Sequence, residues 1–565
     1  MFTIVANLLY SNKPTIIKLF QTNKLLYLYY LYYYTIIRKH INKNKLNYFS
    51  IISFIYISNK LRYYYGINSI KDLLLNIPYI KEKINTNLKK SSQTLEKTFD
   101  TNYIFLTEIP NDSLDVSIVN QKITEMAIRG ENKQVQLTNK ISGTVYINNK
   151  EHDDKLVNIF KQFSYSNPLH NDIYPQINTM EIDIINMCRN LYKGDKNCCG
   201  NVTYGGTESL LLACLTYRDY YYDRGVHYPN IVVPETIHPA VDKACHYFNI
   251  KLVKIPLDKN SGTIIADSLY NYIDYNTILI IGSAPNYSYG TIDPLEEMGI
   301  IAYNRKIGFH IDCCMGGFLI PFLNDFSYIN FKLKGVTSIS MDIHKYGYSL
   351  KGSSVILYNN YKLKKYQHTI NSKWNGGIYA TPTIMGTKSG GLIAAAWASL
   401  LYVGKTNFIK YSEDIVAKLT IIKNKFKYNN HIEIVGNPEL NIIAFISKTK
   451  DMCIYKIVEL MKHKGWRLNI LQNPPSFHFC VTRNHSIEII DEFCNDLEVS
   501  VMEVVNRTEN RTENKDKLTG TLAFYGSTQE IGADMFIDEI IHDYVFLQSN
   551  ETISLTGFAH YALGQ

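Results

Sequence analysis

Short apolar runs recur along the middle of the chain, separated by longer segments in which polar and apolar residues follow a helical period. Clear examples are residues 231–233, 251–255, 277–281 and 354–358. Runs this short indicate buried strands, and their alternation with amphipathic helices is typical of a layered α/β domain with a mostly parallel sheet. We therefore predict a large domain of this kind over residues 141–400.

The segments on either side of this domain have different patterns. Residues 401–565 again combine apolar runs, at 432–435 and 442–446, with amphipathic stretches, which predicts a smaller C-terminal α/β domain. Residues 66–140 are polar and compatible with helices, so we predict a linker with helices there.

The first 65 residues contain two apolar stretches, 25–37 and 46–58, of 13 residues each. A helix needs about 20 residues to cross a bilayer core, although flanking tyrosines and lysines extend its reach by lying at the interface. A membrane anchor and a pair of interfacial amphipathic helices both fit this pattern. The segment has no clear signal-peptide cleavage site.

Composition indicates which partners the basic segment can bind and in which cellular compartment the cysteines lie. The first 100 residues hold 15 Lys and Arg against 4 Asp and Glu, a balance of +11 within a formal net charge of +8. No nucleic-acid-binding motif accompanies this basic segment, so anionic lipid headgroups are a better partner for it than nucleic acid. The ten cysteines include no Cys-x-x-Cys spacing, which favours reduced thiols facing the cytosol and no metal site.

A lysine beside a histidine gives the first chemical signal. Lys345 follows His344, after the apolar run 335–340 and before Gly347. A lysine amine forms a Schiff base with an aldehyde only when it is neutral and held in place, as in enzymes that use pyridoxal 5′-phosphate (PLP). His-Lys pairs usually lie on solvated surfaces, so this interpretation depends on three motifs that come earlier in the chain.

The first of these motifs is an aspartate 33 residues before the lysine. The apolar run 300–310 predicts a buried strand that ends at Asp312. PLP becomes an electron sink only while its pyridine nitrogen is protonated, and a neighbouring carboxylate stabilises that form. Asp312 is the candidate partner of this nitrogen, and the alternative is an aspartate that caps a turn.

The other two motifs precede Asp312. Gly205, Gly206 and Thr207 open an apolar helix, where glycines let backbone N–H groups approach an anion and the helix N-terminus favours negative charge. This predicts a phosphate loop, with an ordinary helix N-cap as the alternative. His238 follows the short strand 230–233 and can lie flat against an aromatic cofactor, whereas an isolated histidine is usually structural.

The order of these motifs resembles that of fold-type-I PLP enzymes of the group II decarboxylase class. Within that class the chain closely resembles the sphingosine-1-phosphate lyase family, from about residue 142 to about residue 526, some two thirds of its length. The Asn-Pro-Leu-His run and the His-Lys-Tyr-Gly-Tyr run separate this family from the amino-acid decarboxylases. The motifs that carry the resemblance lie at 166–173, 204–209, 282–285, 290–294, 344–348, 351–354 and 376–383.

The resemblance implies a fold, a cofactor and a set of site residues. The fold would be the fold type I of PLP-dependent transferases, an α/β fold with a large and a small domain behind an N-terminal membrane-anchor segment. Lys345 would be the Schiff-base lysine, Asp312 the pyridinium partner and His238 the residue that stacks on the ring. The other implied site residues are Gly205, Gly206 and Thr207 at the cofactor phosphate, together with Asn167, His170, Ser283, His344, Tyr146, Tyr379 and Lys351.

The resemblance also implies a reaction in sphingolipid degradation. The substrate would be a phosphorylated sphingoid base, and cleavage of its C2–C3 bond in a retro-aldol step would give a long-chain aldehyde and phosphoethanolamine. The candidates for the base that takes the C3 hydroxyl proton are Lys351, Tyr146, Tyr379 and Lys345, because reach and pKa identify a base and sequence gives neither. The alternatives are a group II decarboxylase of free amino acids and a catalytically inactive membrane scaffold.

For assembly and location, the resemblance implies a homodimer with a shared active site, embraced by the helices of residues 66–140. It also implies one N-terminal membrane anchor, with the catalytic domain facing the cytosol at the endoplasmic reticulum. By position the expected span is 46–65, although Lys60 and Arg62 count against it, and 25–37 is the rival.

Three motifs depart from the family pattern. Tyr204 stands where the family usually has serine, and Met341 and Ile343 stand where it has alanine and threonine. The family has Gly-Ser-Arg-Pro-Gly-Gly where this chain has Gly-Thr-Lys-Ser-Gly-Gly at 386–391. Arginine binds phosphate with two parallel hydrogen bonds and lysine acts as a point charge. If Lys388 contacts a substrate phosphate, we expect weaker binding or relaxed specificity.

Overall fold

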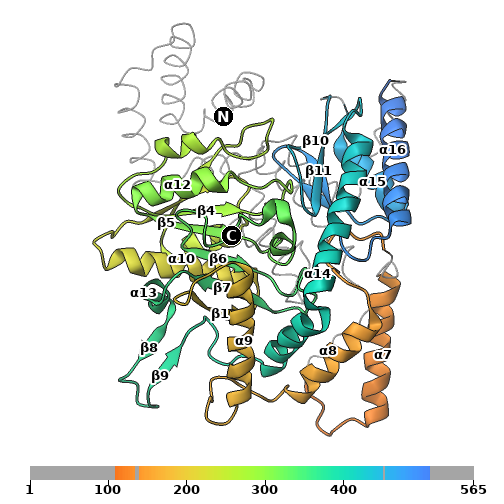
Figure 1. Ribbon diagram of the computed structural model, residues 1–565. Coiled ribbons are helices and arrows are strands. Elements are labelled where there is room, and N and C mark those ends of the chain that lie inside the picture. Colours follow the sequence, from red (N-terminus) through yellow and green to blue (C-terminus); the bar gives the residue numbers. More distant parts are fainter. Residues whose placement is uncertain (1–107, 134–138, 450–451, 510–565) are drawn as a thin grey trace, which may run out of the picture. The chain divides into compact units, whose positions relative to one another are not determined.

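The computed structural model describes residues 108–133, 139–449 and 452–509, all within one compact unit of the chain, Asn102–Glu530. Its strands form a seven-stranded sheet, a four-stranded sheet and a two-stranded hairpin (Figure 1). The anchor predicted in residues 1–65, with both of its candidate spans, lies outside the described residues.

The seven-stranded sheet has the order β1-β7-β6-β5-β4-β2-β3. Strands β2 to β6 are paired in parallel, and β7 is antiparallel to both of its neighbours, β6 and β1. The predicted α/β fold with a mostly parallel sheet is therefore confirmed. The strands are β1 (Cys199–Thr203), β2 (Asn230–Pro234), β3 (Lys251–Ile255), β4 (Thr277–Ser283), β5 (Gly308–Asp312), β6 (Ser338–Met341) and β7 (Ser354–Tyr358).

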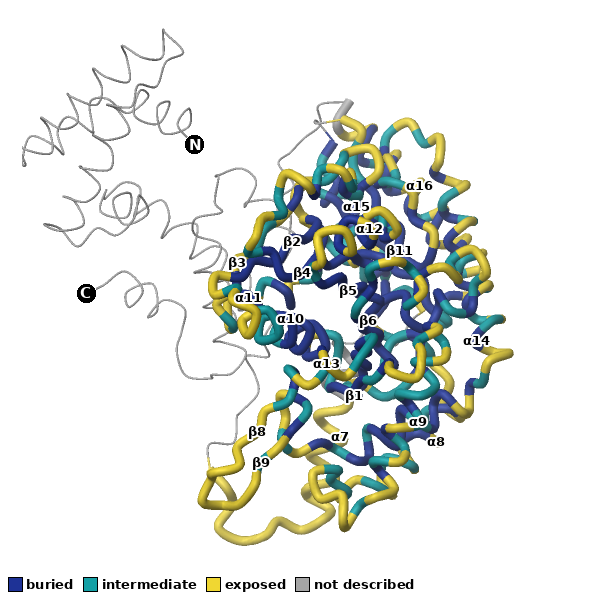
Figure 2. Tube along the Cα trace, turned by 60° about the vertical axis from the view of Figure 1, so that its left-hand side comes forward, coloured by how far each residue is buried: buried dark blue, intermediate teal, exposed yellow. Residues whose placement is uncertain are grey.

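Helices cover both faces of this sheet. On one face lie α10 (Gly206–Tyr222) and α11 (Ala240–Phe248), and on the other α9 (Pro175–Leu191) and α12 (Leu295–Arg305). Neighbouring residues of one strand therefore enter different cores: Ile280 packs with α9 and α12, whereas Ile281 packs with α10 and α11. Burial on both faces explains why these strands are continuous apolar runs rather than alternating ones. The strands β2, β4, β5 and β6 are buried along their whole length and are dark in Figure 2 for the same reason, whereas the edge strand β3 is partly exposed.

One predicted strand was too long. The apolar run 300–310 belongs to two elements, since α12 continues to Arg305 and β5 begins only at Gly308. Lys306, in the left-handed conformation with φ of 57°, ends the helix. A helix with one buried face and a buried strand give similar apolar runs over a few residues, so the sequence pattern did not separate them.

The C-terminal part of the chain forms an antiparallel sheet of order β10-β11-β13-β12. Its strands are β10 (Ile432–Ile434), β11 (Ile442–Ser447), β12 (Asn469–Leu471) and β13 (Ser476–Cys480), and α15 (Ile454–His463) and α16 (Ile487–Glu509) pack beside them. The predicted runs at 432–435 and 442–446 correspond to β10 and β11. Short 3-10 helices occupy Ala266–Asn271, Ile320–Phe322, Asn324–Phe326 and Lys365–Gln367.

The longest helix within the described residues is α14 (Gly390–Phe426), which contacts β10 and β11 and bends at Gly404 (Figure 1). By length and composition it could cross a membrane, and half of its most apolar window is buried inside the protein. It packs against α8 (Lys150–Gln162) and α9, with Ile393, Ile415 and other apolar residues in the core. These contacts are those of a core helix.

Two elements expose apolar side chains instead of burying them. Helix α7 (Val116–Lys133) exposes Val116 and Ile123, and the hairpin of β8 (Thr369–Asn371) and β9 (Tyr379–Thr381) exposes Trp374 and Ile378. The hairpin follows the short helix α13 (Tyr361–Lys364) and projects from the main sheet as a largely exposed loop (Figure 2). Exposed apolar surface of this kind is typical of a contact with another protein or a membrane.

A buried carboxylate at the end of β4 makes stability depend on pH. Asp293 accepts a hydrogen bond from the Ser283 backbone N–H at 2.8 Å, and its Oδ1 has no partner among the described residues. Burial, with a smaller contribution from the charge of Asp312, raises the pKa of Asp293 to about 7. The native protein therefore binds more protons than the unfolded chain between the ordinary aspartate pKa and pH 7, so its free energy of unfolding falls as pH rises through that window.

We expect Asp293→Asn to remove this dependence. The asparagine keeps an oxygen for the Ser283 N–H but does not ionise, so the wild type should lose on the order of 4 kcal/mol more than the variant between pH 4 and pH 8. Urea unfolding at both pH values measures the difference. Equal pH slopes for the two proteins would contradict the assignment.

Candidate active site

A cavity of about 490 Å³ opens where the phosphate-loop helix α10 meets the loop that follows β6. Its volume suits a small-molecule site. Six residues predicted from the sequence line it together: Gly205, Gly206, Thr207, His238, His344 and Lys345.

Lys345 is held in the cavity by an aspartate three residues earlier. Its Nζ lies 2.9 Å from Oδ2 of Asp342, whose side chain is buried and whose Oδ1 lacks a partner within the part of the chain that the structure describes. Burial is the largest single effect and lowers the pKa of Lys345. The charge of Asp342, together with smaller effects of Cys314 and Tyr146 and the hydrogen bond to Asp342, nevertheless raises that pKa overall. Burial likewise would raise the pKa of Asp342, and the charge of Lys345 leads the effects that lower it. The pair therefore keeps the amine in place as a cation, and the amine must give up that proton before it forms a Schiff base.

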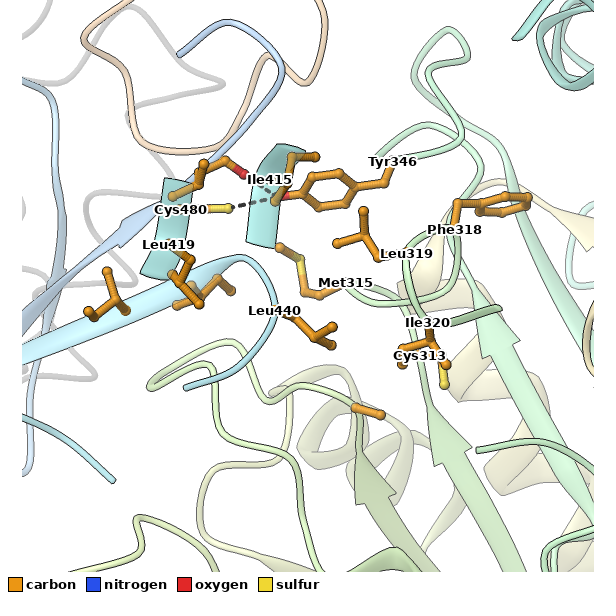
Figure 3. Packing of buried hydrophobic residues seen from close by; sticks show 14 of the residues in the cluster. Cys313, Met315, Phe318, Leu319, Ile320, Tyr346, Ile415, Leu419, Leu440 and Cys480 are labelled. Atoms are coloured by element: carbon orange, nitrogen blue, oxygen red, sulfur yellow. Dashed lines mark hydrogen bonds between the residues drawn. The ribbon is translucent and has the colours of Figure 1, made fainter. Parts of the chain in front are cut away.

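The backbone beside Lys345 is anchored from the next residue. The Tyr346 hydroxyl donates to the Val481 carbonyl at 2.7 Å and lies 3.3 Å from Cys480 Sγ (Figure 3). The ring is fully buried, and Figure 3 shows it among side chains from the loop after β5, such as Leu319, and from α14, such as Ile415. These contacts fix the position from which the Lys345 side chain enters the cavity.

The phosphate loop is shaped by two glycines. Gly205 caps α10 with φ of 142°, a conformation that favours glycine. A Cβ on Gly206 would lie 2.7 Å from Cys314 Sγ and 2.9 Å from Asp342 Oδ1, so only glycine fits there. The first N–H groups of a helix have no intrahelical partner, and here they face a cavity that also contains a lysine and a histidine. These residues fit the phosphate and aldehyde ends of PLP.

His238 lies on the cavity wall just after β2. Its Nδ1 accepts a hydrogen bond from the Ala240 N–H at 3.1 Å, so the neutral ring carries its proton on Nε2. The backbone bond fixes the ring orientation, as a residue that stacks on a cofactor requires.

Asp312 and Ser283 lie behind the cavity rather than on its wall. They end the neighbouring strands β5 and β4 and are paired in register. Asp312 is buried, and its Oδ1 accepts from the Cys314 N–H at 2.9 Å, while Cys314 itself lines the cavity. Asp312 therefore does not itself line the cavity, although Cys314, to which it is hydrogen-bonded, does.

Tyr146 and Lys351 lie together near Lys345. Lys351 Nζ is 4.8 Å from the centre of the Tyr146 ring and donates to the Thr144 carbonyl at 2.7 Å. Partial burial, followed by the charge of Lys345, lowers the pKa of Lys351. Burial raises the pKa of Tyr146. Of the two, Lys351 is the group whose proton is easier to remove.

Three further predicted residues do not line the cavity, and neither do Asp312, Ser283, Tyr146 and Lys351. Asn167 accepts hydrogen bonds from the backbone N–H groups of Leu169 at 3.1 Å and of Lys388 at 3.4 Å. His170 is exposed. Tyr379 lies on β9 in the projecting hairpin, beside Trp374.

Lys388, which stands where the family has arginine, forms an ion pair away from the cavity. Lys388 Nζ lies 2.8 and 2.7 Å from the two carboxylate oxygens of Glu181, and both side chains are nearly buried. Glu181 also accepts from the Val202 N–H at 3.1 Å, which ties α9 to β1. Lys388 therefore serves the packing of the protein and does not face the cavity.

We expect Lys388→Met to reduce stability rather than substrate affinity. An unpaired Glu181 would remain in the interior, so the free energy of unfolding should fall by about 3–5 kcal/mol, with KM unchanged. Urea unfolding and steady-state kinetics measure the two quantities. The double variant Lys388→Met/Glu181→Gln should recover most of the loss. A raised KM at unchanged stability would instead assign Lys388 to the substrate.

Sequence reasoning missed several residues on the cavity wall. Asp342 could have been found, because its position three residues before Lys345 places both side chains on one side of the turn. Glu208, Ile384 and Met385 come from segments far apart in the chain, and no sequence pattern joins them. Among the described residues, no group of three His, Cys, Asp or Glu side chains could hold a metal ion.

Comparisons with known proteins agree with this geometry. The pyridoxal-dependent decarboxylase conserved domain matches residues 165–448. Sphingosine-1-phosphate lyase 1 of Rattus norvegicus is 37% identical over 85% of this chain and 84% of its own length. The Arabidopsis thaliana sphingosine-1-phosphate lyase is 34% identical over 85% of this chain and 88% of its own.

Solved structures give the same assignment. The Burkholderia pseudomallei sphingosine-1-phosphate lyase matches with a TM-score of 0.68 at 31% identity, over 77% of this chain and 98% of that one. Glutamate decarboxylase of Lactobacillus brevis, at 19% identity and a TM-score of 0.62 over 72% of this chain and 96% of that one, shares the fold. The chain belongs to the sphingosine-1-phosphate lyase family, within the pyridoxal-dependent decarboxylases.

Proposed function

We propose that this protein is a PLP-dependent carbon–carbon lyase that cleaves sphingosine 1-phosphate and related phosphorylated sphingoid bases between C2 and C3. The products are a long-chain aldehyde and phosphoethanolamine, which makes the reaction a step of sphingolipid degradation. The observation that carries the proposal is one cavity in which Lys345, paired with Asp342, faces the N-terminus of α10 and His238.

The cavity residues divide the work of holding the cofactor. Lys345 supplies the amine that binds the aldehyde, and the N–H groups at the start of α10 bind the phosphate. His238, fixed by the Ala240 N–H, contacts the ring, and Asp312 at the end of β5 stabilises the protonated pyridine nitrogen. Bound PLP supplies the electron sink for the pair of electrons released when the C2–C3 bond breaks.

Lys351 is the base that we assign to the C3 hydroxyl. A base must lose its own proton readily, and the lowered pKa of Lys351 favours this, whereas the pKa of Tyr146 and that of Lys345 are raised. Solvent still reaches Lys351, so its proton can exchange with water. As Lys351 takes the hydroxyl proton, the C2–C3 bond breaks and the C3–O bond becomes the aldehyde C=O. The proton taken by Lys351, or one exchanged for it with water, is then added at C2 and completes phosphoethanolamine.

The test is incubation of the purified protein with PLP and sphingosine 1-phosphate, with both products measured by mass spectrometry. The proposal expects aldehyde and phosphoethanolamine in equal amounts. Carbon dioxide release from free amino acids, with sphingosine 1-phosphate left intact, would identify a decarboxylase instead.

We further propose that the protein acts as a homodimer. The exposed apolar side chains of α7 and of the β8–β9 hairpin support this, because a second subunit would bury them. Tyr379 and His170, which lie outside the cavity of their own chain, are candidates to complete the site of the partner. Light scattering of the purified protein should give twice the mass of one chain, and a monomer that retains activity would refute the shared site.

We also propose that residues 1–65 attach the protein to the endoplasmic reticulum membrane, with the catalytic part in the cytosol. The two apolar stretches and the balance of +11 in the first 100 residues support attachment to an anionic surface. Deletion of residues 1–65 should move the protein from the membrane fraction to the soluble fraction. Retention of the shortened protein on membranes would contradict the anchor.

A further inference from the structure

One wall of the cavity comes from the segment 384–389, which connects the β8–β9 hairpin to α14. Ile384 and Met385 line the cavity beside the phosphate loop, and each side chain is about half exposed (48%). The segment has no regular secondary structure, so side chains from elsewhere must hold it in place.

Glu208 holds the first residue of this segment. Its Oε1 accepts the Ile384 N–H at 3.0 Å, and its Oε2 accepts the Tyr204 N–H at 2.7 Å. Glu208 is 9% exposed, and both of its oxygens are occupied. One carboxylate therefore connects the phosphate loop to a segment 176 residues away.

Tyr204 holds the last residue of the segment. Its hydroxyl oxygen accepts a hydrogen bond from the Ser389 N–H, at the start of α14. Tyr204 and Ser389 are two of the positions at which this chain departs from the family pattern, and the structure brings them together. A proline at position 389 would have no N–H to donate, so this bond needs the residues found here at both positions.

We propose that Tyr204 and Glu208 are positioning residues that hold the 384–389 segment against the phosphate loop, so that Ile384 and Met385 form an apolar edge for the alkyl chain of the substrate. The substrate assignment rests on the proposed function. Neither residue is needed for bond breaking, so loosening the segment should raise KM and leave kcat nearly unchanged.

The test uses Tyr204→Phe, which removes the hydroxyl and keeps the ring. We expect hydrogen–deuterium exchange to become faster in peptides covering 384–389, and KM for a long-chain substrate to rise about three- to tenfold, the worth of one hydrogen bond. KM for a short-chain phosphorylated analogue should change less than twofold, because a short chain does not reach the apolar edge. The cofactor absorption band should stay as in the wild type.

A double-mutant cycle separates the hydrogen bond from other effects. Ser389→Pro removes the donor, and the φ of −74° at Ser389 suits proline. If both changes break the same bond, Tyr204→Phe/Ser389→Pro should raise KM no more than either change alone. Tyr221→Phe is the matched control, since it removes a hydroxyl that donates to Lys306 O at 2.9 Å at the far end of α10.

The outcomes separate this proposal from the proposed function. Exchange in 384–389 does not depend on the substrate, so an inactive wild type would refute the proposed function while exchange still tests the contact. Unchanged exchange in Tyr204→Phe would overturn the holding role. Faster exchange with unchanged KM, or with equal effects on long and short substrates, would overturn the role of the segment in binding the alkyl chain.

Discussion

Replacing Lys345 with alanine should reduce cleavage of sphingosine 1-phosphate by on the order of 10⁴-fold or more, a loss typical of removing the residue that binds covalently. Lys345 is the lysine on the wall of the described cavity, and no neighbouring lysine there can take its place. Lys351 reaches the Thr144 carbonyl and the Tyr146 ring instead. Product formation by mass spectrometry and the absorption band of the bound cofactor measure the effect.

A second substitution distinguishes loss of the reactive amine from loss of folding. Lys345→Ala leaves the buried charge of Asp342 unpaired, which by itself destabilises the protein. Lys345→Arg keeps a positive charge beside Asp342 but cannot lose its proton, so it should fold and remain equally inactive. Lys155→Ala is the control, because this exposed lysine pairs with Glu151 on α8 and lies over the Tyr402 ring, and it is not on the cavity wall. Substantial turnover by Lys345→Arg would show that another amine carries the reaction.

Gly206→Ala should weaken cofactor binding by about 10²-fold, which corresponds to about 2.8 kcal/mol. The added Cβ would approach Cys314 Sγ to 2.7 Å and Asp342 Oδ1 to 2.9 Å. Neither neighbour can move freely, since Cys314 is buried and Asp342 is held by Lys345. The loop must therefore shift, and its N–H groups then no longer point at the phosphate of the cofactor. Titration of the cofactor-free protein with PLP, followed by absorption, measures the affinity.

Two companion variants identify the cause of this loss. Cys314→Ala in the Gly206→Ala background removes one of the two clashing atoms, so part of the affinity should return. Gly225→Ala is the matched control, because Gly225 has φ of 89° but nothing within 4 Å of its added Cβ. It should cost stability through backbone strain and leave PLP affinity unchanged. Full PLP affinity in Gly206→Ala would show that the loop does not need a glycine there.

Much of the fold was readable from local pattern. The runs at 231–233, 251–255, 277–281 and 354–358 became β2, β3, β4 and β7. Strand β3 is an edge strand that is partly exposed, but for β2, β4 and β7 the reason is burial on both faces, which requires uninterrupted apolar strands. The failure at 300–310 has the same origin: α12 buries Ile301 and Ala302, so the helix and β5 look alike in sequence. Only the left-handed turn at Lys306 separates them.

The site was predictable where residues act close together in the chain. His344 and Lys345 are adjacent, and the glycines of the phosphate loop open their own helix, so local spacing was enough to identify each motif. The structure brings the two motifs onto one cavity. Asn167, His170 and Tyr379 were chosen by resemblance, and their place in a site of two subunits stays a prediction. Asp342, whose charge pairs with Lys345, could have been predicted from its position three residues earlier, but it was not.

The sequence by itself determined the α/β class, the order of the strands along the chain and the PLP-type motifs, because these depend on hydrophobic period and on short-range geometry. The tertiary structure alone decided the contacts between distant segments. Lys388 was open to interpretation as a phosphate ligand until Glu181, 207 residues away, was seen beside it. Tyr204 stands where the family usually has serine, and nothing in the sequence explains the larger side chain. The structure gives a reason, because the Ser389 N–H donates a hydrogen bond to the Tyr204 hydroxyl. Charge pairing and hydrogen bonding act over a few ångströms of space, and sequence separation carries no information about that distance.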